Sequence, residues 1–227
     1  MTKLIAWLGG TIFVTSLALT AWWYFIQLGQ PRPFAGWNAL AVDALLVTIF
    51  AAHHSLFARD RVKRALTFIS PPLTRSSYVW IASNLLIVVV MLWQPVGGLV
   101  YDVSGRYAFG HAMLQATGVF LIARAVQGLD PLELAGIRQA SGVPAKLEPL
   151  QVGGPYRIVR HPLYLGWMLA LFGAARMTGD RLAFAALTSA YLVIAIPWEE
   201  RSMRQSFGQD YERYASRVRW RVLPFVY

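Results

Sequence analysis

The chain has 227 residues, of which 56% are hydrophobic and only 14% are charged, yet its formal net charge is +10. This apolar composition excludes a disordered chain and argues against a nucleic-acid-binding module, where basic residues lie on a polar background. Because the chain has no cysteine, a disulfide scaffold, a Cys-ligated metal site and a cysteine nucleophile are excluded as well. We therefore expect an integral membrane protein with neither a metal nor a nucleic-acid partner.

Long apolar runs predict five to six transmembrane helices, since about 20 apolar residues cross a bilayer as one helix. In chain order, the runs lie near Leu4–Gln27, Asn38–Ala58, Tyr78–Gln94, Ala108–Gln127, Pro162–Ala175 and Leu182–Trp198. The predicted fold class is therefore an all-α integral membrane protein. Because only residues 176–181 separate the last two runs, these are expected to form a C-terminal helical hairpin.

The fifth run is short for a membrane span. At 1.5 Å per residue, Pro162–Ala175 would extend about 21 Å, against a hydrocarbon core of about 30 Å. Its first turn is therefore expected where water and lipid meet. Gly166, Ala170 and Ala174 lie four residues apart in this run, and such a stripe of small residues permits close helix packing.

The basic residues predict the orientation in the membrane. With the N-terminus inside and six spans, the inner segments carry 16 Lys and Arg residues and the outer segments carry 4. Since cytoplasmic segments are enriched in Lys and Arg, both termini are expected to be cytoplasmic, in a bacterial inner membrane. An amphipathic cytoplasmic tail that covers the site is expected after the hairpin, with apolar side chains at helical spacing at Met203, Phe207, Tyr211 and Tyr214.

Residues before the fifth run form a candidate anion site. Pro162 suits the first position of a helix, which places Arg160 and His161 at the helix N-terminus. Unpaired N–H groups, the positive end of the helix dipole and an Arg together favour a carboxylate or phosphate. The alternative interpretation is a basic loop that anchors the helix to acidic lipid headgroups.

The pair Glu199-Glu200 forms a candidate site at the cytoplasmic end of the sixth run. Two carboxylates at a helix C-terminus oppose the helix dipole, so Arg201, Arg204 or a ligand should compensate them. In a hairpin this pair would lie at the depth of Arg160 and His161. One end then suits an anion and the other a cation or hydroxyl groups, and S-adenosylmethionine offers all of these.

The C-terminal third resembles the membrane methyltransferase superfamily, which includes isoprenylcysteine carboxyl and phospholipid methyltransferases. The resemblance rests on residues 153–164 (GGPYRIVRHPLY), on the Glu pair 38 residues after the His, and on residues 207–214 (FGQDYERY). It implies S-adenosylmethionine as cofactor in a membrane-embedded site. The implied cofactor-binding residues are Tyr156, Arg160, His161, Tyr164, Glu199 and Glu200.

The N-terminal half resembles bacterial methanethiol S-methyltransferases and NnrU-like proteins. Residues 54–59 (HSLFAR), 75–79 (RSSYV) and 93–98 (WQPVGG) carry this resemblance, whereas His53 stands where those enzymes tend to have Gln. We expect residues 1–127 to form a four-helix N-terminal membrane region. Residues 128–227 would hold the cofactor, with both parts in one integrated membrane domain.

The resemblance implies methyl transfer to a small or lipophilic acceptor, with a thiol favoured over a prenylcysteine or an amine lipid. A thiol reacts as the thiolate, so a base is needed. Since an imidazole titrates near neutral pH, His54 is the first candidate base and His161 the second, with Arg160 also assigned to catalysis. One alternative is an NnrU-like haem protein or isomerase, in which His53 or His54 would ligate the haem with His161. A non-enzymatic assembly factor or lipid-binding protein is another.

Overall fold

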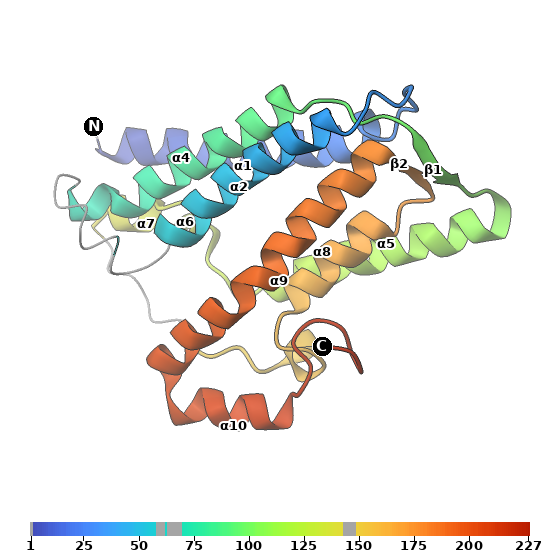
Figure 1. The fold of residues 1–227 in the computed structure, drawn as a ribbon. Helices are drawn as coiled ribbons and strands as arrows, with labels where there is room; N and C mark the ends of the chain where they lie inside the picture. The colour runs from blue at the N-terminus through green and yellow to red at the C-terminus, as the bar shows by residue number, and fades with distance from the viewer. Residues whose placement is uncertain (1, 58–61, 63–69, 143–148) are drawn as a thin grey trace. The chain divides into compact units, whose positions relative to one another are not determined.

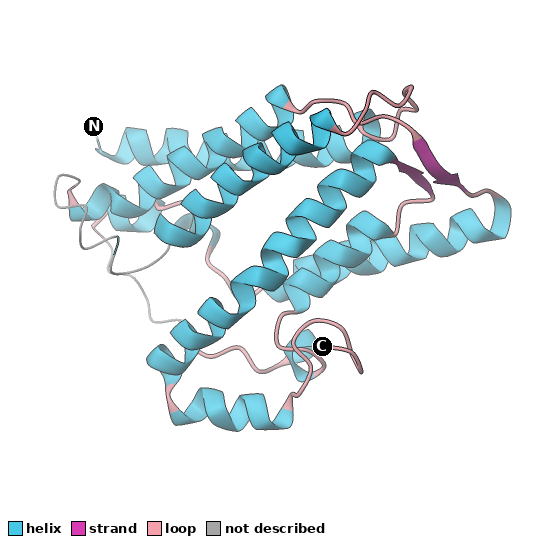
Figure 2. Ribbon diagram, viewed as in Figure 1, coloured by secondary structure: helices cyan, strands magenta, loops and turns pink. Residues whose placement is uncertain are grey.

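Figure 1 shows the fold in a computed structural model, which describes residues 2–57, 62, 70–142 and 149–227. Within these ranges, five helices are long and apolar enough to cross a membrane. These are α1 with its π-helical extension η1, then α2, α4, α5 and α9, over Thr2–Trp22, Trp23–Gln27, Asn38–Phe57, Pro71–Leu92, Gly105–Val126 and Gly179–Phe207. The predicted all-α membrane class is confirmed, and Figure 2 shows that helices dominate the described chain.

Some predicted features lie outside the described residues. They are Ala58, which ends the second run, the last two residues of the motif at 54–59, and five basic residues used for the orientation, namely Arg59, Arg61, Lys63, Arg64 and Lys146.

Packing divides the chain into two compact units. The first comprises Met1–Gly98 and Leu129–Leu147, and the second comprises Leu99–Gly128 and Glu148–Tyr227. The predicted functional division after residue 127 stays a prediction.

The first unit contains α1, α2 and α4, with the short helices α6 and α7 at Pro131–Leu134 and Ile137–Ala140. Small residues let these helices approach one another. A Cβ on Gly9 would lie 2.7 Å from the Trp80 indole nitrogen, which donates a hydrogen bond of 2.9 Å to the Ile5 carbonyl. The glycine therefore makes room for a side chain that ties α4 to α1.

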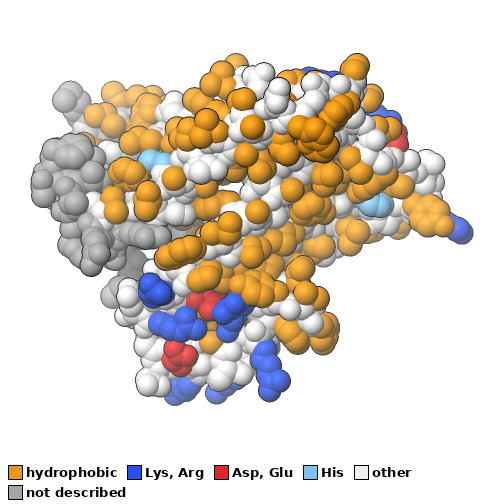
Figure 3. Space-filling model, in the orientation of Figure 1, with side chains coloured by type: hydrophobic (Ala, Val, Ile, Leu, Met, Phe, Trp, Pro, Cys, Tyr) orange, Lys and Arg blue, Asp and Glu red, His pale blue; other side chains and the backbone are white. Residues whose placement is uncertain are grey.

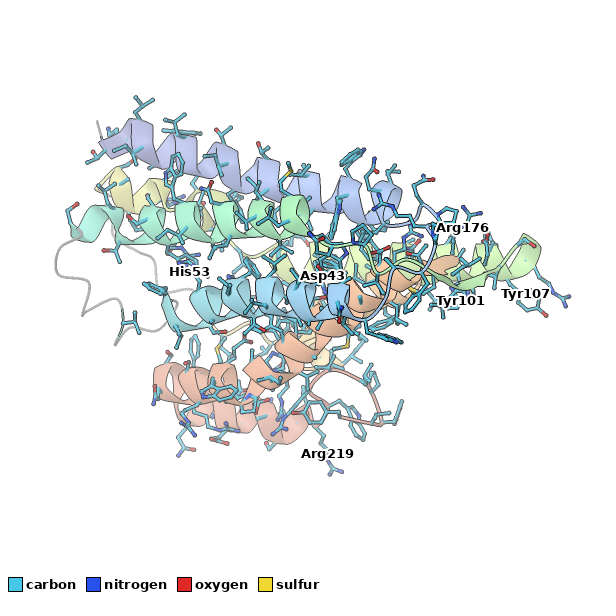
Figure 4. The ribbon with its side chains drawn as sticks, turned by 45° about the horizontal axis from the view of Figure 1, so that its top comes forward. Asp43, His53, Tyr101, Tyr107, Arg176 and Arg219 are labelled. Carbon is cyan, nitrogen blue, oxygen red and sulfur yellow. The ribbon has the colours of Figure 1, made fainter. Side chains whose placement is uncertain are left out.

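A buried carboxylate organises the other end of the first unit. Asp43 on α2, labelled in Figure 4, is fully buried and accepts a 2.8 Å hydrogen bond from the Gln94 backbone N–H just after α4. Nearby, Gly97 adopts φ +70°, and a Cβ there would lie 1.9 Å from the Pro33 carbonyl oxygen. These contacts fix the loop after α4 against the connection between α1 and α2.

The second unit contains α5, α8, α9 and α10, of which α8 spans Pro162–Phe172 and α10 spans Gln209–Arg217. Helix α8 packs closely on α5 through the predicted stripe of small residues. A Cβ on Gly118 of α5 would lie 2.4 Å from the Ala170 nitrogen and 2.5 Å from the Gly166 carbonyl oxygen. Backbone contact at this distance is possible only where side chains are minimal.

The connection between α8 and α9, the two helices of the predicted hairpin, contains a short β-strand. Helix α8 ends at Phe172, so it is about 16 Å long, and an extended segment follows it. In this segment β2, Arg176–Thr178, pairs antiparallel with β1, Leu99–Asp102. A 2.7 Å ion pair joins Arg176 and Asp102 across the two strands.

Candidate active site

The residues before α8 are held by a segment far along the chain. Backbone N–H groups of Arg160 and His161 donate hydrogen bonds of 2.9 and 2.8 Å to the carbonyls of Trp220 and Arg221. Pro162 then begins the helix, as predicted. Segment 220–221 therefore fixes both predicted anion-site residues through the backbone, which leaves their side chains to contact α9.

Glu200 is the buried centre of a cationic cluster. Its side chain is only 1% exposed, and its Oε1 lies 2.9 Å from Arg160 Nε. His161 Nε2 and Arg221 Nε each lie 3.6 Å from Oε1, and Arg204 lies 3.5 Å from Oε2. Three guanidinium groups thus surround one carboxylate, but Arg204 also pairs with Glu212, whose Oε1 lies 2.9 Å from Arg204 Nε. The positive charge in excess of Glu200 therefore comes from Arg160 and Arg221.

Glu199 occupies a different environment although it is the adjacent residue. Its side chain is 44% exposed, and one carboxylate oxygen lies 3.5 Å from His161 Nδ1. The other accepts a short hydrogen bond from the Tyr164 hydroxyl. Tyr164 also stacks on His161, with ring centroids 5.2 Å apart. Glu199 is therefore oriented by α8 while its carboxylate stays accessible.

Three tyrosines form a layer beside this cluster. The Tyr214 hydroxyl donates a 2.9 Å hydrogen bond to the Tyr156 carbonyl, and the Tyr156 hydroxyl donates one of 3.3 Å to the Ala125 carbonyl. Burial, with the Glu199 charge adding to it, raises the pKa of Tyr156. Burial and the Glu200 charge likewise raise the pKa of Tyr211 to about 12. These phenols are therefore neutral hydrogen-bond donors near neutral pH.

The structure brings most of the sequence-predicted residues together and adds one. Arg204 lies 3.5 Å from Glu200, as anticipated from the sequence, whereas Arg221 is a member of the cluster that the sequence did not predict. The alternation of Arg and apolar residues over 217–222 was the available signal. That alternation sends Val222 into the core beside Tyr164 while the preceding Arg221 faces Glu200.

His54 lies in the first unit, whereas the other predicted site residues lie in the second. Its Nδ1 lies 2.8 Å from the Tyr78 hydroxyl of α4. The neighbouring His53 is buried and stacks between Phe57 and Tyr78, with ring centroids 4.7 and 5.5 Å away. The two histidines therefore share Tyr78 as a partner, and His54 is the more exposed of the two.

The chain is similar in sequence to known methyltransferases. A family profile described as phospholipid methyltransferase matches residues 137–210, a range that includes Arg160, His161 and the Glu pair. Methanethiol S-methyltransferase of Pseudomonas deceptionensis is 36% identical over 208 residues, which cover 85% of this chain and 78% of the relative. The enzyme of that name from Pseudomonas sp. (strain GM41(2012)) is 34% identical over 223 residues, which cover 91% and 84%.

The chain belongs to the methanethiol S-methyltransferase family.

As a member of the methanethiol S-methyltransferase family, the chain is a membrane methyltransferase. The resemblance expected from both halves of the sequence is confirmed, because the matched regions extend over most of the chain. The relatives favour a methyltransferase over the haem-protein alternative. No solved structure matches the chain.

Proposed function

We propose that this protein transfers a methyl group from S-adenosylmethionine to a small thiol at the cytoplasmic face of a bacterial inner membrane. The observation that carries the proposal is the division between the adjacent carboxylates. Glu200 is enclosed by Arg160, Arg204 and Arg221, whereas Glu199 stays accessible beside His161. The names of the relatives support methanethiol or a similar thiol as the acceptor.

The charged and polar side chains of the candidate site match the functional groups of S-adenosylmethionine. Its carboxylate would be held by Arg221, whose side chain is partly exposed beside Glu200 and can reach an added anion. Its ammonium group or ribose hydroxyls would be held by the exposed carboxylate of Glu199. Tyr156 would offer its hydroxyl oxygen as an acceptor, since its raised pKa keeps the phenol protonated and its one O–H donates to the Ala125 carbonyl. When bound, the cofactor supplies an electrophilic methyl group on a sulfonium.

In this proposal, the side chains of the second unit bind the cofactor and orient its neighbours. Tyr164 donates to Glu199 and so fixes the direction of that carboxylate. Glu200 keeps Arg160 and His161 in place from the α9 side, while segment 220–221 does so through their backbones. Because in-line displacement needs donor and acceptor in near-attack geometry, we assign Tyr164 and Glu200 to positioning.

His54 is the proposed base for the acceptor thiol, with His161 as the second candidate. The Tyr78 hydroxyl lies 2.8 Å from His54 Nδ1 and 3.4 Å from the His54 carbonyl oxygen. A tyrosine that donates to this carbonyl accepts from Nδ1–H, which leaves the lone pair on Nε2 to take the thiol proton. The S–H bond then breaks, its electron pair stays on sulfur, and the sulfur can form the new S–C bond.

The orientation follows from charge and helix length. Glu199 lies 20 residues after Gly179, the first residue of α9, which places it about 30 Å along the helix. This equals the thickness of the hydrocarbon core, so the Glu pair lies at a membrane surface. The segments on the side of the Glu pair carry the excess of Lys and Arg, so we assign that surface, and both termini, to the cytoplasm.

The test is cofactor binding by purified protein, followed by methyl transfer to a panel of acceptors. We expect Glu199→Gln to weaken S-adenosylmethionine binding strongly while the fold is retained. Product should form from methanethiol and not from a prenylcysteine or an amine phospholipid. A Soret band together with no cofactor binding would support the haem alternative instead. A purified protein that binds the cofactor and methylates only an amine lipid would overturn the assignment of a thiol.

A further inference from the structure

The segment Trp220–Tyr227, called the tail loop below, packs one side against the candidate site. Its Trp220 and Arg221 carbonyls accept the N–H groups of Arg160 and His161. Val222 is buried in a cluster with Tyr164 and Ile196. The inner side of the loop is thus fixed to α8 and α9.

The outer side of the tail loop exposes apolar side chains. Phe225 is 85% exposed, Val226 is 76% exposed and Leu223 is also exposed. Phe225 adopts φ 66°, a left-handed conformation that a bulky side chain rarely takes. The N–H groups of Arg221, Val222 and Leu223 all donate to the Tyr227 carbonyl, and these bonds hold the turn closed. The loop therefore displays Phe225 in a strained but hydrogen-bonded conformation.

The depth of the loop matches the edge of the bilayer. Arg221 lies 3.6 Å from Glu200, which lies about 30 Å along α9 from Gly179. A helix that enters the hydrocarbon at Gly179 leaves it at this level. The exposed Trp198 on α9 lies beside the Glu pair, and aromatic residues favour the interface between lipid and water.

Positive charge borders the apolar tip. Arg217 and Arg219 are exposed and directly precede the loop. Figure 4 shows the Arg219 side chain, just before the tail loop, pointing outward. Basic side chains gather around the end of α9 and around α10, below the apolar helices, in Figure 3. An apolar tip with adjacent arginines complements an anionic lipid surface.

We propose that the tail loop binds the anionic lipid interface of the membrane that holds the helices. Phe225 and Val226 insert among the upper acyl carbons, and Arg217 and Arg219 contact lipid phosphates. Because the same loop holds the backbones of Arg160 and His161, it fastens the start of α8 at the membrane surface. This lipid contact is independent of the identity of the methyl acceptor.

The absence of cysteine allows a direct test with a single label. Val226→Cys carries an environment-sensitive fluorophore, and the protein is reconstituted in phosphatidylcholine vesicles with or without phosphatidylglycerol. Quenching by a lipid-borne nitroxide is compared with quenching by aqueous iodide. Gln209→Cys, at an exposed polar position that begins α10, is the matched control.

We expect the label at Val226 to be quenched by the nitroxide, shielded from iodide and more deeply inserted when phosphatidylglycerol is present. In those vesicles, Arg219→Gln should lower the ratio of inserted to free loop by about fivefold, since one interfacial Arg contributes about that factor. Equal nitroxide quenching at positions 226 and 209, or iodide quenching at 226 like that of the free dye, would overturn the proposal. Shielding that rises with protein density and ignores the nitroxide would show a second copy of the chain instead.

Discussion

Replacing Glu200 with Gln tests whether this carboxylate organises the cluster. The substitution keeps the side-chain volume but removes the charge 2.9 Å from Arg160, whose side chain is only 10% exposed. At an effective dielectric constant of 20, that contact alone has a Coulomb energy of about 6 kcal/mol. Desolvation of both ions offsets much of this energy. Removing one partner of a buried pair nevertheless costs about 3–5 kcal/mol, because the other charge is left buried and unpaired.

We therefore expect Glu200→Gln to lower the free energy of unfolding by about 3 kcal/mol, since the half-exposed Arg204 and Arg221 are screened by solvent and add little. The assay is reversible unfolding in mixed micelles, titrated with a denaturing detergent. Glu199→Gln is the matched control, and its loss should stay within about 1 kcal/mol because Glu199 is partly exposed.

The double variant Arg160→Met/Glu200→Met isolates the coupling between the two buried charges. Its loss of stability should be smaller than the summed losses of the single variants Arg160→Met and Glu200→Met, because neither charge is then left unpaired. Additive losses, or a larger loss for Glu199→Gln than for Glu200→Gln, would refute the assignment of Glu200 as the buried centre.

Three further expectations concern packing and titration. Gly118→Leu should separate α5 from α8 and abolish monodisperse elution on size exclusion, because its Cβ alone would lie 2.4 Å from the Ala170 nitrogen; normal elution would contradict this packing. Gly97→Ala should lower the thermal midpoint of the purified protein, since a Cβ there would meet the Pro33 carbonyl at 1.9 Å, whereas the open Gly110 tolerates Ala. Burial and the Glu200 charge raise the pKa of Tyr211 to about 12, so its contribution to stability is present below pH 10 and is lost as the pH rises through about 12. Absorbance titration of tyrosinate should therefore show one fewer late-titrating phenol in Tyr211→Phe; an unchanged titration above pH 10 would contradict that burial.

The sequence predicts the helices well because the bilayer imposes a simple rule on length and polarity. Apolar runs of about 20 residues reappear as α1, α2, α4, α5 and α9. The pairing of β1 with β2 was not predicted, since strands of four and three residues between apolar helices carry no readable alternation. The end of α8 at Phe172 was not predicted for a related reason, since the residues that follow it are small or apolar and continue the apolar run to Ala175.

The sequence predicts that the charged residues of the candidate site lie together, but not which of the two carboxylates is buried. Arg160, His161, Glu199 and Glu200 were predicted as site residues because ionisable side chains near membrane spans are energetically costly and are usually functional. Which carboxylate is enclosed depends on Arg221, which reaches the site only through the backbone bonds of the tail loop. Neighbouring residues on a helix point about 100° apart, so the burial of one Glu and the exposure of the other is a property of the packing.

The most direct test of the central claim is S-adenosylmethionine binding by the purified protein, measured by calorimetry for the unsubstituted chain, Glu199→Gln and Arg201→Gln. Arg201 is an exposed neighbour on the same helix and serves as the control. We predict that the unsubstituted chain and Arg201→Gln bind the cofactor with similar affinity and that Glu199→Gln, while still folded, loses at least about tenfold, the value of one charge-assisted contact. Equal binding by all three proteins would contradict the placement of the cofactor at the Glu pair.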